Sequence, residues 1–412
     1  MKVNKWTIGL AAVGLVSLPA GVQAEEQANP VLTALSSTTI SGYVNSSAHW
    51  NVGSGNANPP AYSFNSGKQD GFNLDVVKLS IGKPLDEAEW AAGYQADLLF
   101  GPDANTLATQ SSGTAGDFAI QQAYVSLRTP IGNGVDFKVG VWDTIVGYEV
   151  FDAGSNPNYT RSWGYSIEPT THTGVLGSYQ VNDIISLGFG IANTFGPTIN
   201  DRAFLTGTGN SKSESYKTYL GSIALTAPEE MGFLEGSTLY FGIVNGFDTG
   251  SAENKTHFYG GATIATPVES VTLGVAYDYV GLHDNPPAGG GKHAYALAGY
   301  ISFQATEKLS LHGRADYLKM SQASVPTNPT LGTQAGLAEK VFSLTGTVQY
   351  DLWANVLSRL EVRWDHQAGG HSGDAFGGEG SNNNNPPGDS PGGDWGSTKN
   401  SVLVAANIIY QF

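Results

Sequence analysis

The sequence predicts an all-β protein: a transmembrane, antiparallel, up-and-down β-barrel of about sixteen strands. Three observations support this prediction. Apolar and polar side chains alternate through most of the chain, the connections between the alternating segments are short and long in turn, and the last segment ends on an aromatic residue. A strand places successive side chains on opposite faces, so the alternation gives each segment one apolar and one polar face.

The alternation is clearest in residues 271–279, 309–317 and 360–364. Many segments run for about ten residues or more, which is long for strands of soluble proteins but matches the ~9–11 residues of a tilted strand crossing a bilayer. Sixteen segments are expected near residues 38–52, 72–83, 89–100, 118–129, 135–142, 172–180, 184–195, 214–227, 237–246, 255–266, 270–282, 293–305, 308–318, 340–350, 355–368 and 397–412.

The connections support a barrel in the outer membrane. Short connections follow the even segments, and Asn133-Gly134 and Asn182-Asp183 have the chemistry of hairpin turns. Long connections follow the odd segments. A barrel with both chain ends in the periplasm has short periplasmic turns and long extracellular loops, whereas a soluble β-sandwich has no reason to sort its loops by length.

Composition excludes several classes of protein. The chain has 412 residues, a net charge of −16 and no cysteine, which rules out disulfide scaffolds and thiolate metal sites. The acidic excess argues against a nucleic-acid partner. No hydrolase, phosphate-loop or metalloprotease motif is present, so we expect no enzyme, no metal and no cofactor. His283-Asp284 leaves an outer-membrane hydrolase as a minor alternative.

The first 24 residues are typical of a signal peptide. Lys2 and Lys5 precede an apolar run over residues 6–18, and Val22-Gln23-Ala24 is a cleavage site of the usual kind. The run is too short for a membrane-spanning helix. We therefore expect export from the cytoplasm, a short periplasmic segment over residues 25–37, and a barrel over residues 38–412.

Two long loops differ in character. Residues 369–396 are rich in Gly, Asn and Pro, which predicts a flexible extracellular loop rather than a calcium site. Residues 143–171 are not of low complexity and contain five aromatic side chains. A loop of that composition is expected to pack on something. As the third long loop of the chain it resembles the loop that folds into the pore in general porins, which implies that it enters the barrel and forms a pore constriction.

The expected constriction combines two sets of charges. The acidic residues and one arginine of the loop are Asp143, Glu149, Asp152, Glu168 and Arg161, and the arginines of the opposite wall are Arg314, Arg359 and Arg363. One hypothesis is that the two sets face each other across the pore and create a transverse field. The other is local pairing of each wall arginine with the acidic residue two positions along its strand. Both hypotheses stay open at this point.

Three stretches of the loop region resemble a known family. Residues 140–151 (GVWDTIVGYEVF), 156–162 (NPNYTRS) and 169–175 (PTTHTGV) are similar to the OmpL-like β-barrel porin family, porin-2. The resemblance implies a bacterial outer-membrane pore. It supplies no catalytic or ligand-binding residues.

The favoured function is that of a porin for passive diffusion of small hydrophilic solutes and ions. About sixteen strands leave an aqueous channel, whereas eight are filled by side chains. The alternatives are a substrate-selective channel, for example one that guides carbohydrates along the loop aromatics, and a closed structural or loop-binding barrel. Expected partners are outer-membrane lipid, the barrel-assembly machinery and two further copies of the chain in a homotrimer. Tyr410 and Phe412 are the expected assembly signal.

Overall fold

The computed structural model describes most of the chain. The described residues are 37–52, 68, 70–111, 116–203, 215–247, 254–283, 293–321, 339–369, 376 and 398–412. The expected signal peptide, residues 25–36 of the expected periplasmic segment, Asp284 and most of the loop at 369–396 lie outside these residues. Those expectations therefore stay predictions.

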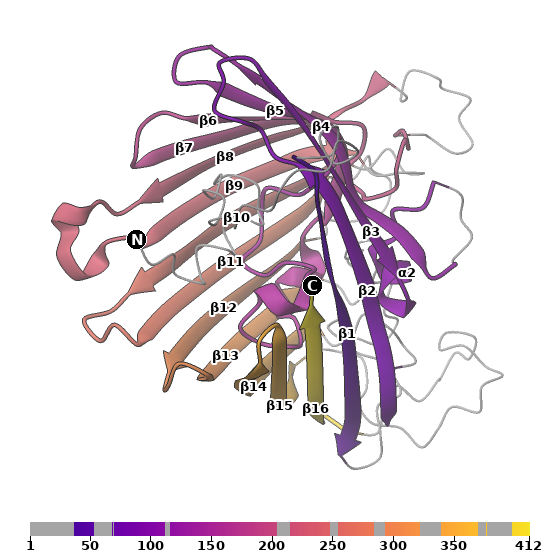
Figure 1. Cartoon of the computed structure of the whole chain (residues 1–412). Coiled ribbons are helices and arrows are strands. Elements are labelled where there is room, and N and C mark those ends of the chain that lie inside the picture. Colours follow the sequence, from indigo (N-terminus) through magenta and orange to yellow (C-terminus); the bar gives the residue numbers. More distant parts are fainter. Residues whose placement is uncertain are drawn as a thin grey trace, which may run out of the picture.

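Sixteen antiparallel strands form one closed barrel (Figure 1). The strands are β1 (Thr39–Val52), β2 (Gly71–Lys83), β3 (Ala91–Phe100), β4 (Phe118–Thr129), β5 (Val135–Asp143), β6 (Thr171–Gln180), β7 (Ile185–Ala192), β8 (Thr218–Thr226), β9 (Thr238–Phe247), β10 (Asn254–Ala265), β11 (Val271–His283), β12 (His293–Gln304), β13 (Leu309–Met320), β14 (Lys340–Trp353), β15 (Val356–Gly369) and β16 (Asn400–Gln411). Each strand pairs with its neighbours in sequence, and β1 pairs with β16. The predicted fold class is confirmed.

The first and last strands close the barrel. Their register runs from Tyr43 opposite Gln411 to Val52 opposite Val402. At the end of this seam, Gly42 N donates to Phe412 O at 2.9 Å and Phe412 N donates to Gly42 O at 3.0 Å. Closure gives every strand two partners. A membrane-spanning sheet needs this, because hydrocarbon offers no hydrogen bonds to a free edge.

The two faces of the barrel differ as the alternation predicts. Apolar side chains point outward and are exposed, among them Val139 on β5, Leu297 on β12 and Leu360 on β15. The residues between them point inward, such as Glu361 and Arg363 on either side of the exposed Val362. An apolar outer band and a polar interior fit a barrel surrounded by lipid.

Some strand ends and one helix differ from the sequence prediction. Strand β7 ends at Ala192, short of the expected 195, because the chain turns toward β9 and Phe195 N donates to Phe247 O at 2.7 Å. A short helix, α2 (Pro102–Leu107), lies in the loop after β3 and was not expected. In the described residues, no helix is long and apolar enough to span a membrane.

Candidate constriction loop and the charged wall

The segment between β5 and β6 lies inside the ring of strands (Figure 1). It contains two short 3-10 helices, η2 (Ala153–Ser155) and η3 (Tyr165–Ile167), and most of its side chains are buried. Three apolar clusters fix it to the wall. Its start packs on β6–β12, its middle on β1–β4 and β16, and its end on β11–β14 and β16. Ile145, Phe151 and Trp163 belong to these clusters in that order.

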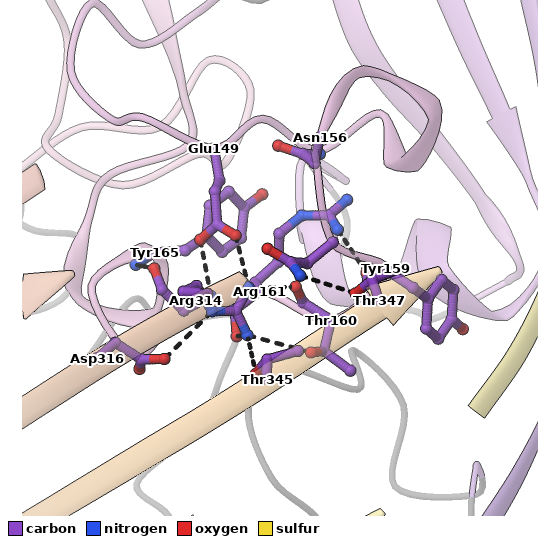
Figure 2. A network of polar contacts seen from close by, with 12 residues as sticks. Glu149, Asn156, Tyr159, Thr160, Arg161, Tyr165, Arg314, Asp316, Thr345 and Thr347 are labelled. Atoms are coloured by element: carbon purple, nitrogen blue, oxygen red, sulfur yellow. Dashed lines mark hydrogen bonds and ion pairs between the residues drawn. The ribbon is translucent and has the colours of Figure 1, made fainter. Parts of the chain in front are cut away.

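Arg314 on β13 is the centre of a polar network that joins the loop to the wall (Figure 2). Its Nη1 lies 2.8 Å from Glu149 Oε1, and its Nε lies 3.1 Å from Asp316 Oδ2. Its guanidinium also donates to Thr160 O at 2.6 Å and to Arg161 O at 3.2 Å. The side chains of Arg314 and Glu149 are 0 % and 1 % exposed, so this ion pair is shielded from water.

Arg363 on β15 makes a second connection. It holds Asp365 through Nε at 2.9 Å and Nη2 at 2.9 Å, and it donates from Nη1 to Arg161 O. The indole of Trp163 stands against this pair. Its Nε1 donates to Asp365 Oδ1 at 2.9 Å and to Ser343 Oγ at 2.8 Å. The Arg363 guanidinium lies 5.5 Å from the Trp163 ring, so packing and charge act on the same loop residue.

Two further side chains of β15 bind the loop backbone. Glu361 accepts from Tyr159 N at 2.6 Å, from Thr160 N at 2.9 Å and from Thr160 Oγ1 at 2.5 Å. Arg359 donates to Ala153 O at 2.8 Å and to Asn156 O at 2.6 Å. Backbone groups of the loop thus take the place of the local partners that the pairing hypothesis gave to these two residues.

Arg161 stabilises the loop itself. It donates from Nε to Val150 O at 2.9 Å, from Nη1 to Tyr159 O at 2.7 Å and from Nη2 to Phe151 O at 2.6 Å. Three carbonyls that cannot bond within a regular element are satisfied in this way. The residue lies inside the loop rather than on a water-lined surface.

The acidic residues Asp143 and Asp152 lie near β2–β4. Asp152 Oδ2 accepts from Lys78 Nζ at 2.8 Å, and its Oδ1 accepts from Tyr43 Oη at 2.9 Å. Asp143 ends β5, is half-buried, and accepts from Gln121 Nε2 at 3.2 Å. These two residues are therefore separated from the wall arginines.

Glu168 precedes β6 and lies beside Asp278 of β11. Burial and the neighbouring Asp278 carboxyl raise the pKa of Glu168 well above its ordinary value. His257 Nε2 lies 3.3 Å from Asp278 Oδ1 on the far side. No group of three or more His, Cys, Asp or Glu side chains in the described part of the chain could hold a metal ion.

These contacts decide between the two geometric hypotheses for the wall arginines. The first placed the arginines across the pore from the loop carboxylates. This expectation is wrong for Arg314, because Glu149 touches it directly and no water-filled gap separates them. Local pairing is found for Arg314 with Asp316 and for Arg363 with Asp365. It is wrong for Arg359, whose guanidinium binds loop carbonyls and Gln349.

Sequence reasoning missed several residues that hold the loop. Tyr159 Oη donates to Asp75 Oδ2 at 2.8 Å and contacts His49 Nε2 at 3.0 Å. Lys78 links Asp152 to Asp97. Alternation places Lys78 on the inner face, but an inward position does not reveal which loop atom it will meet.

A cavity of about 570 Å³ lies below the loop, toward the short turns. Its lining includes Asn156 and Pro157 of the loop, Gln349 and Arg359 of the wall, and Gln411 near the end of the chain. The interior is therefore hollow next to the loop on this side.

Comparison with protein families gives a match to one of them. The family described as "Putative beta-barrel porin-2, OmpL-like" matches residues 37–412, which include the whole described barrel. No curated protein sequence matches the chain.

Solved structures with the same fold are porins. An anion-selective porin from Comamonas acidovorans has a TM-score of 0.57 and 13% identity, over 91% of this chain and 99% of that one. The outer-membrane channel DcaP of Acinetobacter baumannii has a TM-score of 0.54 and 12% identity, over 91% and 97%. The trimer form of OmpT from Vibrio cholerae has a TM-score of 0.54 and 11% identity, over 91% and 99%. At these identities the likeness concerns the fold, whereas the family match covers the whole barrel: the chain belongs to the OmpL-like β-barrel porin-2 family, whose members are outer-membrane channels.

Proposed function

We propose that the protein is an outer-membrane porin through which small hydrophilic solutes and ions diffuse passively, with residues 143–171 narrowing the pore. The observation that carries the proposal is the closed ring of sixteen strands with a polar interior. A barrel of this size is wide enough for an aqueous channel. The cavity of about 570 Å³ below the loop supports a hollow interior.

The eight charged residues expected at the constriction take a revised role in this proposal. Arg314, Arg359 and Arg363 hold the loop against the wall, Arg161 shapes it, and the loop carboxylates serve as their counter-ions or as anchors to other strands. Moving the loop away from the wall would break buried ion pairs and leave uncompensated charges, which is costly. The loop is therefore held in place, and its position sets the size of the pore.

Packing of the loop aromatics favours a pore for passive diffusion over a carbohydrate track. Tyr148 stacks on Tyr300 with ring centroids 4.2 Å apart, and Trp163 is 1 % exposed. Aromatic faces already covered by the wall offer no surface on which a sugar could slide. Aromatic residues contribute most to packing when they are buried in this way.

The same burial favours one second candidate, a closed barrel whose external loops bind a partner. Single-channel recording in planar bilayers separates the two. A porin gives steady, ohmic current steps, and a folded, heat-modifiable barrel that gives no current would overturn the porin proposal in favour of the closed barrel.

We further propose a homotrimer, supported by the trimer form of the OmpT structure, and assembly through the C-terminal Tyr410 and Phe412. Tyr410 is half exposed on the outer face, and the Phe412 backbone completes the β1–β16 seam. Light scattering in detergent should give three chains per particle. The Phe412→Ala variant should reach the membrane in smaller amounts than the wild type.

A further inference from the structure

The loop makes few polar contacts with the wall formed by β4 and β5. Its hydrogen bonds and ion pairs reach β1, β2, β9, β11, β13, β14 and β15. On β4 they are limited to Asp143, which accepts from Gln121 at 3.2 Å and donates from its N to Gln122 Oε1 at 3.4 Å. In the described residues, none of them reaches Tyr124 on β4 or Lys138 on β5. A solute that crosses the barrel is therefore expected to pass this β4–β5 wall rather than the arginines of β13–β15.

Lys138 and Tyr124 both face the interior. Their outward neighbours Val139 and Val125 are opposite each other and exposed to 44% and 50%, so they form part of the lipid face. Lys138 is paired with Ser126, diagonal to Tyr124, and its Nζ lies 4.8 Å from the centre of the Tyr124 ring. Both side chains are half-buried, and an inward side chain that keeps accessible surface faces the lumen.

The charge of Lys138 differs from that of the other inward cations nearby. Lys78 is held by Asp97 at 3.2 Å and Asp152 at 2.8 Å, and Arg128 is held by Asp136 at 2.7 Å. In the part of the chain that the structure describes, no carboxylate forms an ion pair with Lys138.

Two acidic groups lie close enough to act on Lys138 electrostatically, Asp97 and Asp143. Both have other partners. Asp97 accepts from Gln122 at 2.9 Å in addition to its ion pair with Lys78, and Asp143 accepts from Gln121. The ammonium group of Lys138 is thus the positive charge on this wall that a passing solute can approach.

We propose that Lys138, seated over the ring of Tyr124, sets the charge preference of the pore by attracting small anions, such as chloride or a solute carboxylate. This assignment rests on the proposed porin function and deepens it. A charge beside a narrow water-filled path favours counter-ions and opposes ions of its own sign, and the effect is screened over about 10 Å at 0.1 M salt.

The test is the reversal potential of single channels in a gradient of dilute KCl. The Lys138→Met variant should raise the K⁺/Cl⁻ permeability ratio by about twofold or more at ~0.1 M salt, and the change should shrink in ~1 M salt. Lys138→Arg should keep the wild-type ratio. Lys399→Met is the matched control, because Lys399 is an exposed lysine outside the lining of the interior cavity and its loss changes the net charge equally.

A second variant gives a direct reading of the path. The chain has no cysteine, so Lys138→Cys would carry its one thiol. Methanethiosulfonate reagents carrying a sulfonate or an ammonium group should then change the single-channel conductance and move the permeability ratio in opposite directions. Absence of any change with either reagent would show that the side chain does not line the path.

The outcomes separate this assignment from the proposed function. Conducting Lys138→Met channels with the wild-type ratio overturn the assignment and leave the porin function standing. An equal change in Lys399→Met also overturns it, because overall charge would then be the cause. Absence of current in the folded wild-type protein overturns the porin function and the assignment together.

Discussion

Two parts of the inner wall carry charges of the same kind and use them differently. On β13–β15, the arginines are buried and bind carboxylates and carbonyls of the loop. On β4–β5, Lys138 is half-buried over an aromatic ring, and the Arg128–Asp136 pair keeps about a quarter of its surface. The difference arises from the loop, which binds the arginines of the first wall directly but meets the second only through Asp143 and the apolar cluster of Ile145 and Val146.

A charged side chain on the inner face of a barrel can therefore either face water or bind a loop that lies inside the barrel. Burying a guanidinium costs several kcal/mol unless every donor finds an acceptor. The loop supplies these acceptors as backbone carbonyls of Thr160, Arg161, Ala153 and Asn156. Many backbone carbonyls of a segment without regular structure have no hydrogen-bond partner within the segment, so they can accept hydrogen bonds from arginines of the wall.

The largest expected effect on stability comes from removing Arg314, the centre of the contacts between the loop and β13–β15. The Arg314→Met variant leaves Glu149 and Asp316 buried without their cation, which should lower the free energy of unfolding by about 3–5 kcal/mol. Urea unfolding followed by tryptophan fluorescence measures it. Arg128→Met is the control on the β4–β5 wall, where the partly exposed pair should contribute about 1 kcal/mol or less. Equal losses would show that the two walls do not differ.

A smaller effect is expected from the indole of Trp163. The Trp163→Phe variant keeps most of the packing but removes the indole donor from Asp365 and Ser343, which keep only their contacts with Arg363 and with each other. The loss of this donor to a buried carboxylate should cost about 1–3 kcal/mol. Trp353→Phe is the matched control, since Trp353 is 70% exposed and should change stability by no more than about 0.5 kcal/mol. A Trp163→Phe protein as stable as this control would show that the indole N–H does not hold the loop.

The sequence could predict the strands but only part of the loop's role. Alternation with period two fixes both strand and face, so all sixteen strands and the inward position of Arg359 followed from the residues alone. The loop's place in the lumen followed from its aromatic content. Its contacts did not, because partners such as Glu361 with Tyr159 N are about 200 positions apart and involve backbone atoms that carry no sequence information.

The contact between Glu168 of the loop and Asp278 of the wall should make the stability of the protein depend on pH. The pKa of Glu168 is raised by burial and by Asp278, so the folded protein favours the protonated acid. Its contribution to stability is full below the ordinary carboxyl pKa of about 4.3 and is lost as the pH rises from there through the raised pKa. Other titratable groups of this region are His257, beside Asp278, and Glu149, Tyr165 and Tyr259, which act on or respond to Glu168. Unfolding free energies measured from about pH 5 upward should fall for the wild type and stay flatter for Glu168→Gln.

A wild-type curve that runs parallel to that of Glu168→Gln would assign the pH dependence to another group. The His257→Gln variant then identifies whether the imidazole is responsible. Either result bears on the comparison of the two walls, because Glu168 and Asp278 join the loop to the wall without any cation, unlike the arginine contacts.

The smallest effect is expected on the β4–β5 wall. The Lys138→Met variant removes a cation over the Tyr124 ring but leaves no buried charge without a partner, so it should change the unfolding free energy by at most about 1 kcal/mol. The same variant is expected to change ion selectivity, whereas Arg314→Met is expected to act first on stability. A large stability loss in Lys138→Met would mean that this lysine, too, holds the structure together, and the two walls would then differ in degree rather than in function.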